Sequence, residues 1–176
     1  MKKTISILLL AIVTLTGCKN NSEPETIEKQ KPVEDTKPSL NISFVFKTDA
    51  ADIFKIMMNN VIIDEFQKKS IHFSEEVFPT SDFDEMNVVF DSGNLSKNIM
   101  FHLGNQAEKT IEIKSITITY GEKVFTLSKA SDLNDYLVFN KFIEIQPDSK
   151  LLKVKKVEGQ LYPSFSLRQK LINQFK

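Results

Sequence analysis

The chain has 176 residues, and its 23 basic and 23 acidic side chains give a formal net charge of zero at pH 7. Arg168 is the only arginine, so the basic residues are otherwise all lysines. A balanced charge does not attract a polyanion, and arginine is the usual residue that binds phosphates and guanine edges. Composition therefore disfavours nucleic acid as a partner.

Residues 1–17 have the pattern of an export signal. Two lysines, Lys2 and Lys3, precede the apolar run from Ile5 to Leu15, which is shorter than the ~20 residues of a lasting membrane span. The run ends in Leu15-Thr16-Gly17-Cys18, which resembles the bacterial lipobox. The resemblance implies cleavage before Cys18 and lipid attachment to its sulfur. The alternative is an ordinary secretory signal with a chance cysteine nearby.

The predicted product is a lipoprotein of the cell envelope, anchored to a membrane by its lipid. In a Gram-negative cell the outer membrane is the first expectation. Lys19 follows the cysteine with no acidic residue beside it, so the sequence does not decide between the inner and the outer membrane surface. Cys18 is the only cysteine, so no internal disulfide can form. Residues 18–38 contain three prolines and few apolar side chains, which predicts a flexible tether. Residues 39–176 are expected to form one domain.

Alternation of apolar and polar residues predicts strands through most of this domain. The first strand places Leu40, Ile42, Phe44 and Phe46 on one face, and a second one spans Ile99 to Leu103. Further strands are expected near 53–58, 71–73, 87–90, 123–127, 142–146 and 151–157.

The segment 110–120 alternates with a change of phase. Ile111 and Ile113 are in one phase and Ile116, Ile118 and Tyr120 are in the other. A β-bulge at Lys114-Ser115 would bring all five side chains to one face. Gly121-Glu122, which follows directly, predicts a tight hairpin.

Three segments have other patterns. Residues 53–66 are almost continuously apolar and suit a strand pair or a helix, with Asn59-Asn60 favouring a turn between strands. Residues 131–136 suit a short helical turn. After Pro163, Leu167, Leu171 and Phe175 recur every four residues and predict a short C-terminal helix. The expected fold is therefore all-β, an antiparallel two-sheet β-sandwich with a short C-terminal helix.

A resemblance makes this fold more specific. The segments Ile99–Asn105 and Ile111–Ile118 resemble paired strands of the galactose-binding-like jelly-roll domains found in bacterial lipoproteins and polysaccharide-related proteins. Tyr162-Pro163 resembles the closing turn of that pattern. The resemblance implies a jelly-roll sandwich and a glycan as ligand. This chain departs from the pattern at Met100 and His102, which replace an arginine and an aspartate, so the polar pair of the family is absent.

The sequence contains few candidates for metal or catalytic chemistry. His72 and His102 lie in separate predicted strands without further ligands, so we expect strand histidines rather than a zinc site. The acidic residues Asp82, Asp84 and Glu85 lack the ligand spacing of a calcium loop, and a solvated turn is expected there.

Candidate catalytic carboxylates and stacking aromatics are equally few. Asp132 and Asp135 lie too close in sequence to suggest a glycosidase pair and are expected to cap a turn. Tryptophan is absent, and the tyrosines are Tyr120, Tyr136 and Tyr162. Tyr120 is in phase with Ile116 and Ile118, so its ring is expected in the core rather than on a ligand platform.

The functional hypothesis is a non-enzymatic binding module for a glycan or another envelope component. We expect no cofactor, no metal and no catalytic residue, and the sequence assigns no ligand-binding residue. The alternative is a structural or assembly lipoprotein that docks on a protein partner through a sandwich edge or the C-terminal helix. Ile172, off the stripe of the predicted helix, is the candidate docking residue, and the competing possibility is that this helix only caps the sandwich.

Overall fold

The computed structural model describes residues 38–58, 72–90 and 98–175. The predicted signal peptide, the lipidation site Cys18 and the tether up to residue 37 lie outside the described residues. The predicted turn at Asn59-Asn60 and the apolar residues 61–66 lie outside them as well.

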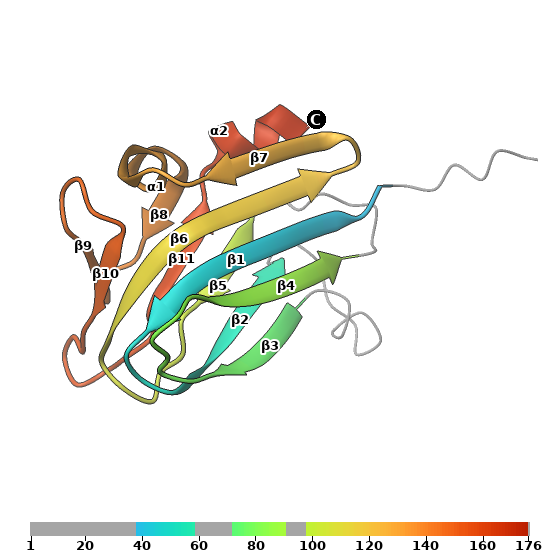
Figure 1. Cartoon of the computed structure of the whole chain (residues 1–176). Coiled ribbons are helices and arrows are strands. Elements are labelled where there is room, and N and C mark those ends of the chain that lie inside the picture. The colour runs from blue at the N-terminus through green and yellow to red at the C-terminus, as the bar shows by residue number, and fades with distance from the viewer. Residues whose placement is uncertain (1–37, 59–71, 91–97, 176) are drawn as a thin grey trace, which may run out of the picture. The chain divides into compact units, whose positions relative to one another are not determined.

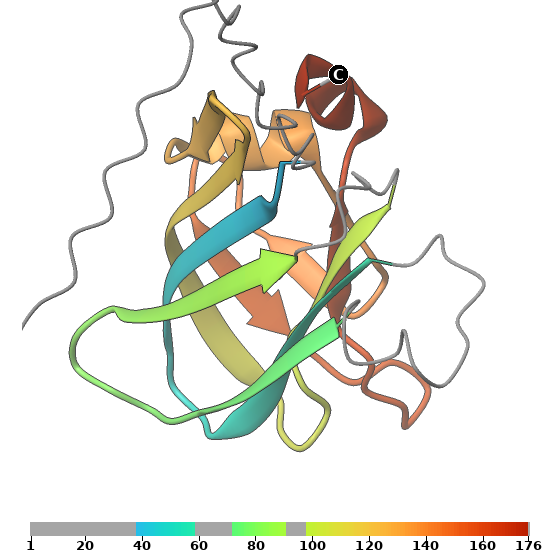
Figure 2. The same cartoon turned by 90° about the vertical axis from the view of Figure 1, so that its right-hand side faces the viewer.

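Two antiparallel sheets face each other and enclose the core, as the two-sheet prediction requires (Figures 1 and 2). The first sheet has the order β4 (Asp84–Phe90), β1 (Leu40–Thr48), β6 (Lys109–Tyr120), β10 (Leu151–Val154) and β9 (Ile143–Ile145), with β7 (Lys123–Leu127) also paired to β6. The second has the order β3 (His72–Val77), β2 (Asp52–Met58), β5 (Ile99–His102), β11 (Ser164–Leu167) and β8 (Leu137–Phe139). Short helices are α1 (Ala130–Tyr136) and α2 (Gln169–Ile172), the latter continued by the 3-10 turn η2 (Asn173–Phe175).

Phenylalanines from both sheets form the centre of the core. Phe44 on β1 meets Phe101 on β5 edge-on at 5.5 Å between ring centroids, and Phe101 stacks on Phe165 of β11 at 4.6 Å. Phe46 of β1 and Phe54 of β2 make a third contact, with 5.0 Å between ring centroids and the rings tilted by 38°. Because strand side chains alternate between faces, each strand contributes every second residue to this layer. The two sheets are therefore joined by aromatic contacts across the sandwich.

The predicted bulge in β6 is confirmed. Val45 pairs with Ser115 but Phe46 pairs with Ile113, so Lys114 is the extra residue and points to solvent. Ile111, Ile113, Ile116 and Ile118 are consequently all buried, and Tyr120 packs against the same core while remaining half-buried. The hairpin between β6 and β7 is also confirmed, with Gly121 at a φ of 61° that favours glycine.

The C-terminal prediction is correct in part. Leu167, Leu171 and Phe175 are all buried, but Leu167 belongs to β11 and only residues 169–172 form an α-helix. Ile172, the candidate docking residue, is 0 % exposed, so its side chain is not available for docking, and the competing possibility that the helix caps the sandwich fits the structure. Leu171 and Ile172 both face the core, so the one-turn helix α2 exposes no apolar side chain to solvent. The helix caps the sandwich.

Among the remaining strand predictions, 123–127 has the bounds of β7, and the others are right in place but not in extent. β3 and β4 each extend beyond the predicted residues, at the C-terminal and N-terminal end respectively, and β10 ends before 157. β8 and β11 were not predicted as strands, because three or four residues hold too few alternations to detect. The expected turn at 131–136 is α1, whose start is fixed by Asp132.

Candidate functional site

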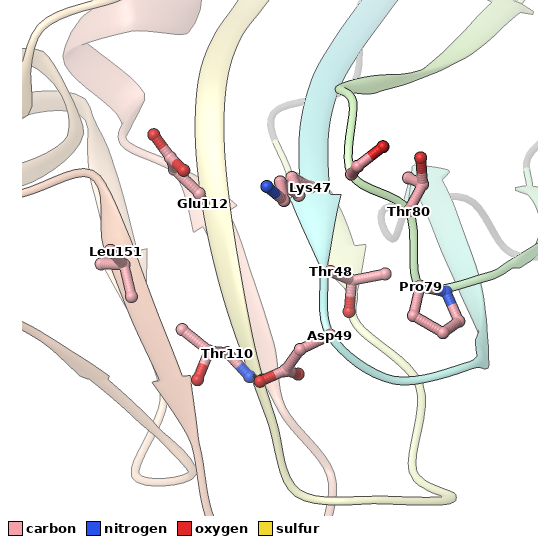
Figure 3. A pocket seen from close by; sticks show the side chains of 9 residues that line it. Lys47, Thr48, Asp49, Pro79, Thr80, Thr110, Glu112 and Leu151 are labelled. Carbon is pink, nitrogen blue, oxygen red and sulfur yellow. Dashed lines mark hydrogen bonds between the residues drawn. The ribbon is translucent and has the colours of Figure 1, made fainter.

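A polar cavity of about 590 Å³ opens on the outward face of the first sheet (Figure 3). Strands β1, β6 and β10 provide part of its lining through Lys47, Thr48, Thr110, Glu112 and Leu151. The turn after β1 adds Asp49, and the loop between β3 and β4 adds Pro79, Thr80 and Ser81. Cavities of 300–1,000 Å³ are the usual size of small-molecule sites.

Strand register explains why three of these side chains meet. Lys47 pairs with Glu112, and Glu112 pairs with Leu151, so the three form one row across β1, β6 and β10. Their sequence neighbours Phe46, Ile111 and Leu152 are buried in the core, which turns the row outward. The row is therefore the floor of the cavity.

The turn after β1 is held by hydrogen bonds. The Asp49 carboxylate accepts a hydrogen bond from the Thr110 N–H at 2.8 Å, and the Asp49 N–H donates to the Thr110 carbonyl at 3.3 Å. The Thr48 hydroxyl donates to the carbonyl of Ala50 at 3.2 Å. Opposite this turn, the hydroxyl of Thr80 accepts from the Asp82 N–H at 3.1 Å and shapes the loop. The walls of the cavity are thus built by local contacts.

The floor carries one basic and one acidic side chain on neighbouring strands. Lys47 and Glu112 are half-buried cross-strand neighbours, yet no ion pair within 4.0 Å joins either of them to another described residue. The floor therefore presents an ammonium donor and a carboxylate acceptor, beside the hydroxyls of Thr80, Ser81 and Thr110. Such a set can hydrogen-bond a ligand that carries both donors and acceptors.

A buried ion pair lies beneath this end of the sandwich. Lys109, whose neighbour Thr110 lines the cavity, places its ammonium on Asp52 at the start of β2, and both side chains are at most 1 % exposed. Lys109 also donates to the carbonyl of Leu103 at 2.8 Å. The Asp52 carboxylate accepts the N–H groups of Ile53, Asn105 and Gln106 at 2.8, 3.1 and 2.9 Å. One pair thereby fixes the loop between β5 and β6 to β2.

The charge of Asp52 is stabilised within this cluster. Burial raises the pKa of the Asp52 carboxyl, but the hydrogen bonds from Lys109, Ile53 and Gln106 outweigh it and the resulting pKa is lowered. Gly104 belongs to the same loop at a φ of 75°, where an added Cβ would lie 2.0 Å from the Asp52 Cγ. Only glycine fits there.

The structure does not bring the predicted histidines together as a site. His72 is exposed on β3, and His102 lies half-buried on β5, where its Nδ1 accepts the Gly104 N–H at 3.2 Å. Burial, with the charge of Lys55 adding to it, lowers the pKa of His102. Among the described residues, no group of three or more histidine, cysteine or carboxylate side chains is placed to hold a metal ion.

The acidic candidates have local structural roles. Asp132 accepts the N–H groups of Ser128 and Lys129 at 3.0 and 2.9 Å and so caps α1, as expected. Asp135 lies 3.9 Å from the Lys170 ammonium. Asp82 is in the loop that forms one wall of the cavity, whereas Asp84 and Glu85 begin β4.

The tyrosines lie away from the cavity lining. Tyr136 packs edge-on against Phe125 at 5.1 Å, under the Lys170 ammonium at 4.5 Å. Tyr162 is 53 % exposed and contacts Phe142 at 6.1 Å. Tyr120 packs against the core, as its phase predicted.

The sequence did not single out the residues that line the cavity. Lys47 and Glu112 lie at the solvent-facing positions of two correctly predicted strands. A polar residue at such a position is the only sequence signal that could have indicated them. Their meeting depends on the pairing of β1 with β6, and Thr80 and Ser81 reach the cavity through a loop. Neither follows from alternation alone.

Comparisons with protein-family models, curated proteins and solved structures gave no match. The functional argument therefore rests on the geometry of the cavity. Within the described ranges, no helix is long and apolar enough to cross a membrane.

Proposed function

We propose that the chain is a membrane-anchored lipoprotein whose β-sandwich is a non-enzymatic binding module, with the polar cavity as its ligand site. The ligand is a glycan or another hydroxyl-bearing component of the cell envelope. The observation that supports this most is the floor of Lys47 and Glu112, a donor and an acceptor without an ion-pair partner among the described residues, beside three hydroxyl side chains. Sugar hydroxyls both donate and accept, so they match this mixture.

The apolar parts of the cavity fit the same class of ligand. Leu151 at one end of the floor and Pro79 in the opposite wall offer small apolar surfaces to the C–H groups of a sugar ring (Figure 3). The lining contains two carboxylates, and that of Asp49 is engaged by the N–H of Thr110, which leaves Glu112 rather than a pair of free carboxylates for a ligand. We therefore assign binding rather than glycan hydrolysis to the cavity. The affinity should be modest, near millimolar, or ~4 kcal/mol.

Titration of the full-length protein in detergent with soluble peptidoglycan fragments and neutral oligosaccharides tests the site. Calorimetry should show binding by at least one of these, and Glu112→Gln or Lys47→Met should weaken it about tenfold, which corresponds to ~1.4 kcal/mol. Glu122→Gln, in the exposed hairpin between β6 and β7, is the matched control and should leave the affinity unchanged. Binding that survives both cavity substitutions would move the ligand elsewhere, and no binding by any of these probes would contradict the glycan assignment.

Membrane anchoring has its own test. Because the sulfur of Cys18 is the proposed lipid acceptor, Cys18→Ala should give a protein that is neither acylated nor cut before residue 18. Phase partitioning and mass spectrometry of the purified chain measure both properties. An acylated, membrane-bound product from this variant would contradict the lipoprotein assignment.

A further inference from the structure

Residues 72–90, which include β3 and β4, form an unusually acidic segment of this lysine-rich chain. They contain Glu75, Glu76, Asp82, Asp84 and Glu85 and neither lysine nor arginine. None of these five carboxylates forms an ion pair with a described residue. We call this segment the acidic edge.

The acidic edge coincides with the outer strands of the two sheets. Among the described strands, β3 pairs only with β2 and β4 pairs only with β1, and Figure 1 shows β3 at the border of the molecule. Within the described ranges, the outer backbone groups of residues 73–77 pair with no other strand, so an added strand can bind to them. Two copies of this edge repel each other, because both carry carboxylates. A strand with basic side chains would instead meet carboxylates of opposite charge.

A groove of about 200 Å³ lies at the C-terminal end of β3. Its apolar lining includes Ala51, Ile53 and Phe78, and Glu76 and Gln106 border it. Phe78 is 61 % exposed and Ile53 is 36 % exposed. The Asp52 carboxylate holds the backbone of Gln106 at 2.9 Å, so one wall is fixed. The groove lies on the β2 side of β3, and its residue Phe78 directly follows β3 and is exposed, so a segment that runs along the open edge of β3 can pack one apolar side chain on the Phe78 ring.

Glu75 is a half-buried carboxylate of the acidic edge. It pairs with Phe54, so its side chain is on the side of β3 that faces the core, where it is half-buried. Burial, and the charge of Asp84 in addition, raise the pKa of Glu75. A cation from a partner would relieve both effects, since it would stabilise the charged form.

We propose that the acidic edge binds an extended, lysine-rich segment of another envelope protein, which adds as a strand beside β3 and packs an apolar side chain on the exposed ring of Phe78. β3 and the groove at its C-terminal end share no lining residue with the cavity, although the β3–β4 loop of the acidic edge forms one cavity wall, so this interaction does not depend on the proposed glycan site. It gives the sandwich edge the docking role for which the buried Ile172 is unsuited.

Peptide binding to the full-length protein in detergent tests the proposal. The probe is a synthetic peptide of alternating lysine and valine, with a glutamate and valine peptide and an N-methylated lysine and valine peptide as controls. The lysine peptide should bind, the glutamate peptide should bind at least about tenfold more weakly, and N-methylation should abolish binding because strand addition needs the backbone N–H groups. Equal binding of the two charge types, undiminished binding after N-methylation, or no binding of the lysine peptide would each overturn the proposal.

Variants of the protein locate the peptide. The double substitution Glu75→Gln and Glu76→Gln should weaken binding about tenfold, which corresponds to ~1.4 kcal/mol. Phe78→Ser should weaken it as well, whereas Glu122→Gln and the cavity variant Lys47→Met should not. Loss of binding with Lys47→Met and not with the edge variants would place the peptide in the cavity and overturn the proposal. The folding of the edge variants is verified by thermal unfolding.

Discussion

Lys109→Met is expected to lower the free energy of unfolding by about 3–5 kcal/mol, the cost of leaving a buried charge without its partner. Methionine has a similar length and keeps the contact with the Phe54 ring, 5.6 Å from the Lys109 ammonium, but it cannot neutralise Asp52. The Leu103 carbonyl also loses a donor. Urea denaturation followed by circular dichroism measures the effect.

Lys153→Met is the matched control, because Lys153 is exposed on β10, two residues from the cavity residue Leu151. Its effect should stay within ~0.5 kcal/mol. A double-mutant cycle with Asp52→Asn then separates the pair from its surroundings, and the two substitutions should not be additive. Additive effects of the two substitutions, or a loss of less than ~1 kcal/mol with Lys109→Met, would contradict a stabilising ion pair.

The same cluster predicts a pH dependence. The pKa of Asp52 is lowered from 3.8 in the folded protein, so its charge stabilises the fold fully above that value. This contribution is lost as the pH falls below about 4 and through the folded-state pKa. The Asp52→Asn variant has no carboxyl group to protonate at this position, so its free energy of unfolding should fall less than that of the wild-type protein over the same acidic range. Identical slopes of unfolding free energy against pH for both proteins would contradict this role of Asp52.

Phe101→Ala is the second large effect and should cost about 3–5 kcal/mol. Phe101 is 1 % exposed and contacts Phe44 of the first sheet and Phe165 of its own sheet, so truncation leaves a cavity at the centre of the sandwich. Phe78→Ala makes the same chemical change at a residue that is 61 % exposed, and should have an effect within ~0.5 kcal/mol. Similar losses in both variants would show that Phe101 does not hold the sheets together.

Alternation predicted the fold well where a strand was long. β1 and β6 were found almost in full, and the phase change at Lys114 located the bulge, because one buried face imposes a period of two on many residues. β8, β11 and the end of the chain were harder. In these segments, Leu167, Leu171 and Phe175 are buried by contacts across the molecule, and a spacing of four residues does not distinguish helix from strand in so few positions.

The cavity was beyond the reach of the sequence for a different physical reason. Lys47, Asp49, Glu112 and Thr80 come from three separated stretches of the chain and meet only through strand register and a loop. The buried pair of Asp52 and Lys109 is similar, because residues 57 positions apart in the chain are joined in space. The one local indication of the buried pair is Lys109 itself, a lysine at the start of β6 that alternates with the buried Ile111 and Ile113.

The most direct test of the proposed binding module is to map a bound ligand on the protein by two-dimensional NMR of the full-length chain in detergent micelles, titrated with soluble peptidoglycan fragments. The account predicts that backbone amide shifts change first at residues 47–49, at Thr80 and Ser81, and at 110–112, and that Glu112→Gln reduces these changes at equal ligand concentration. Shift changes confined to β3, to α2 or to residues scattered over both sheets would contradict a glycan site in the cavity.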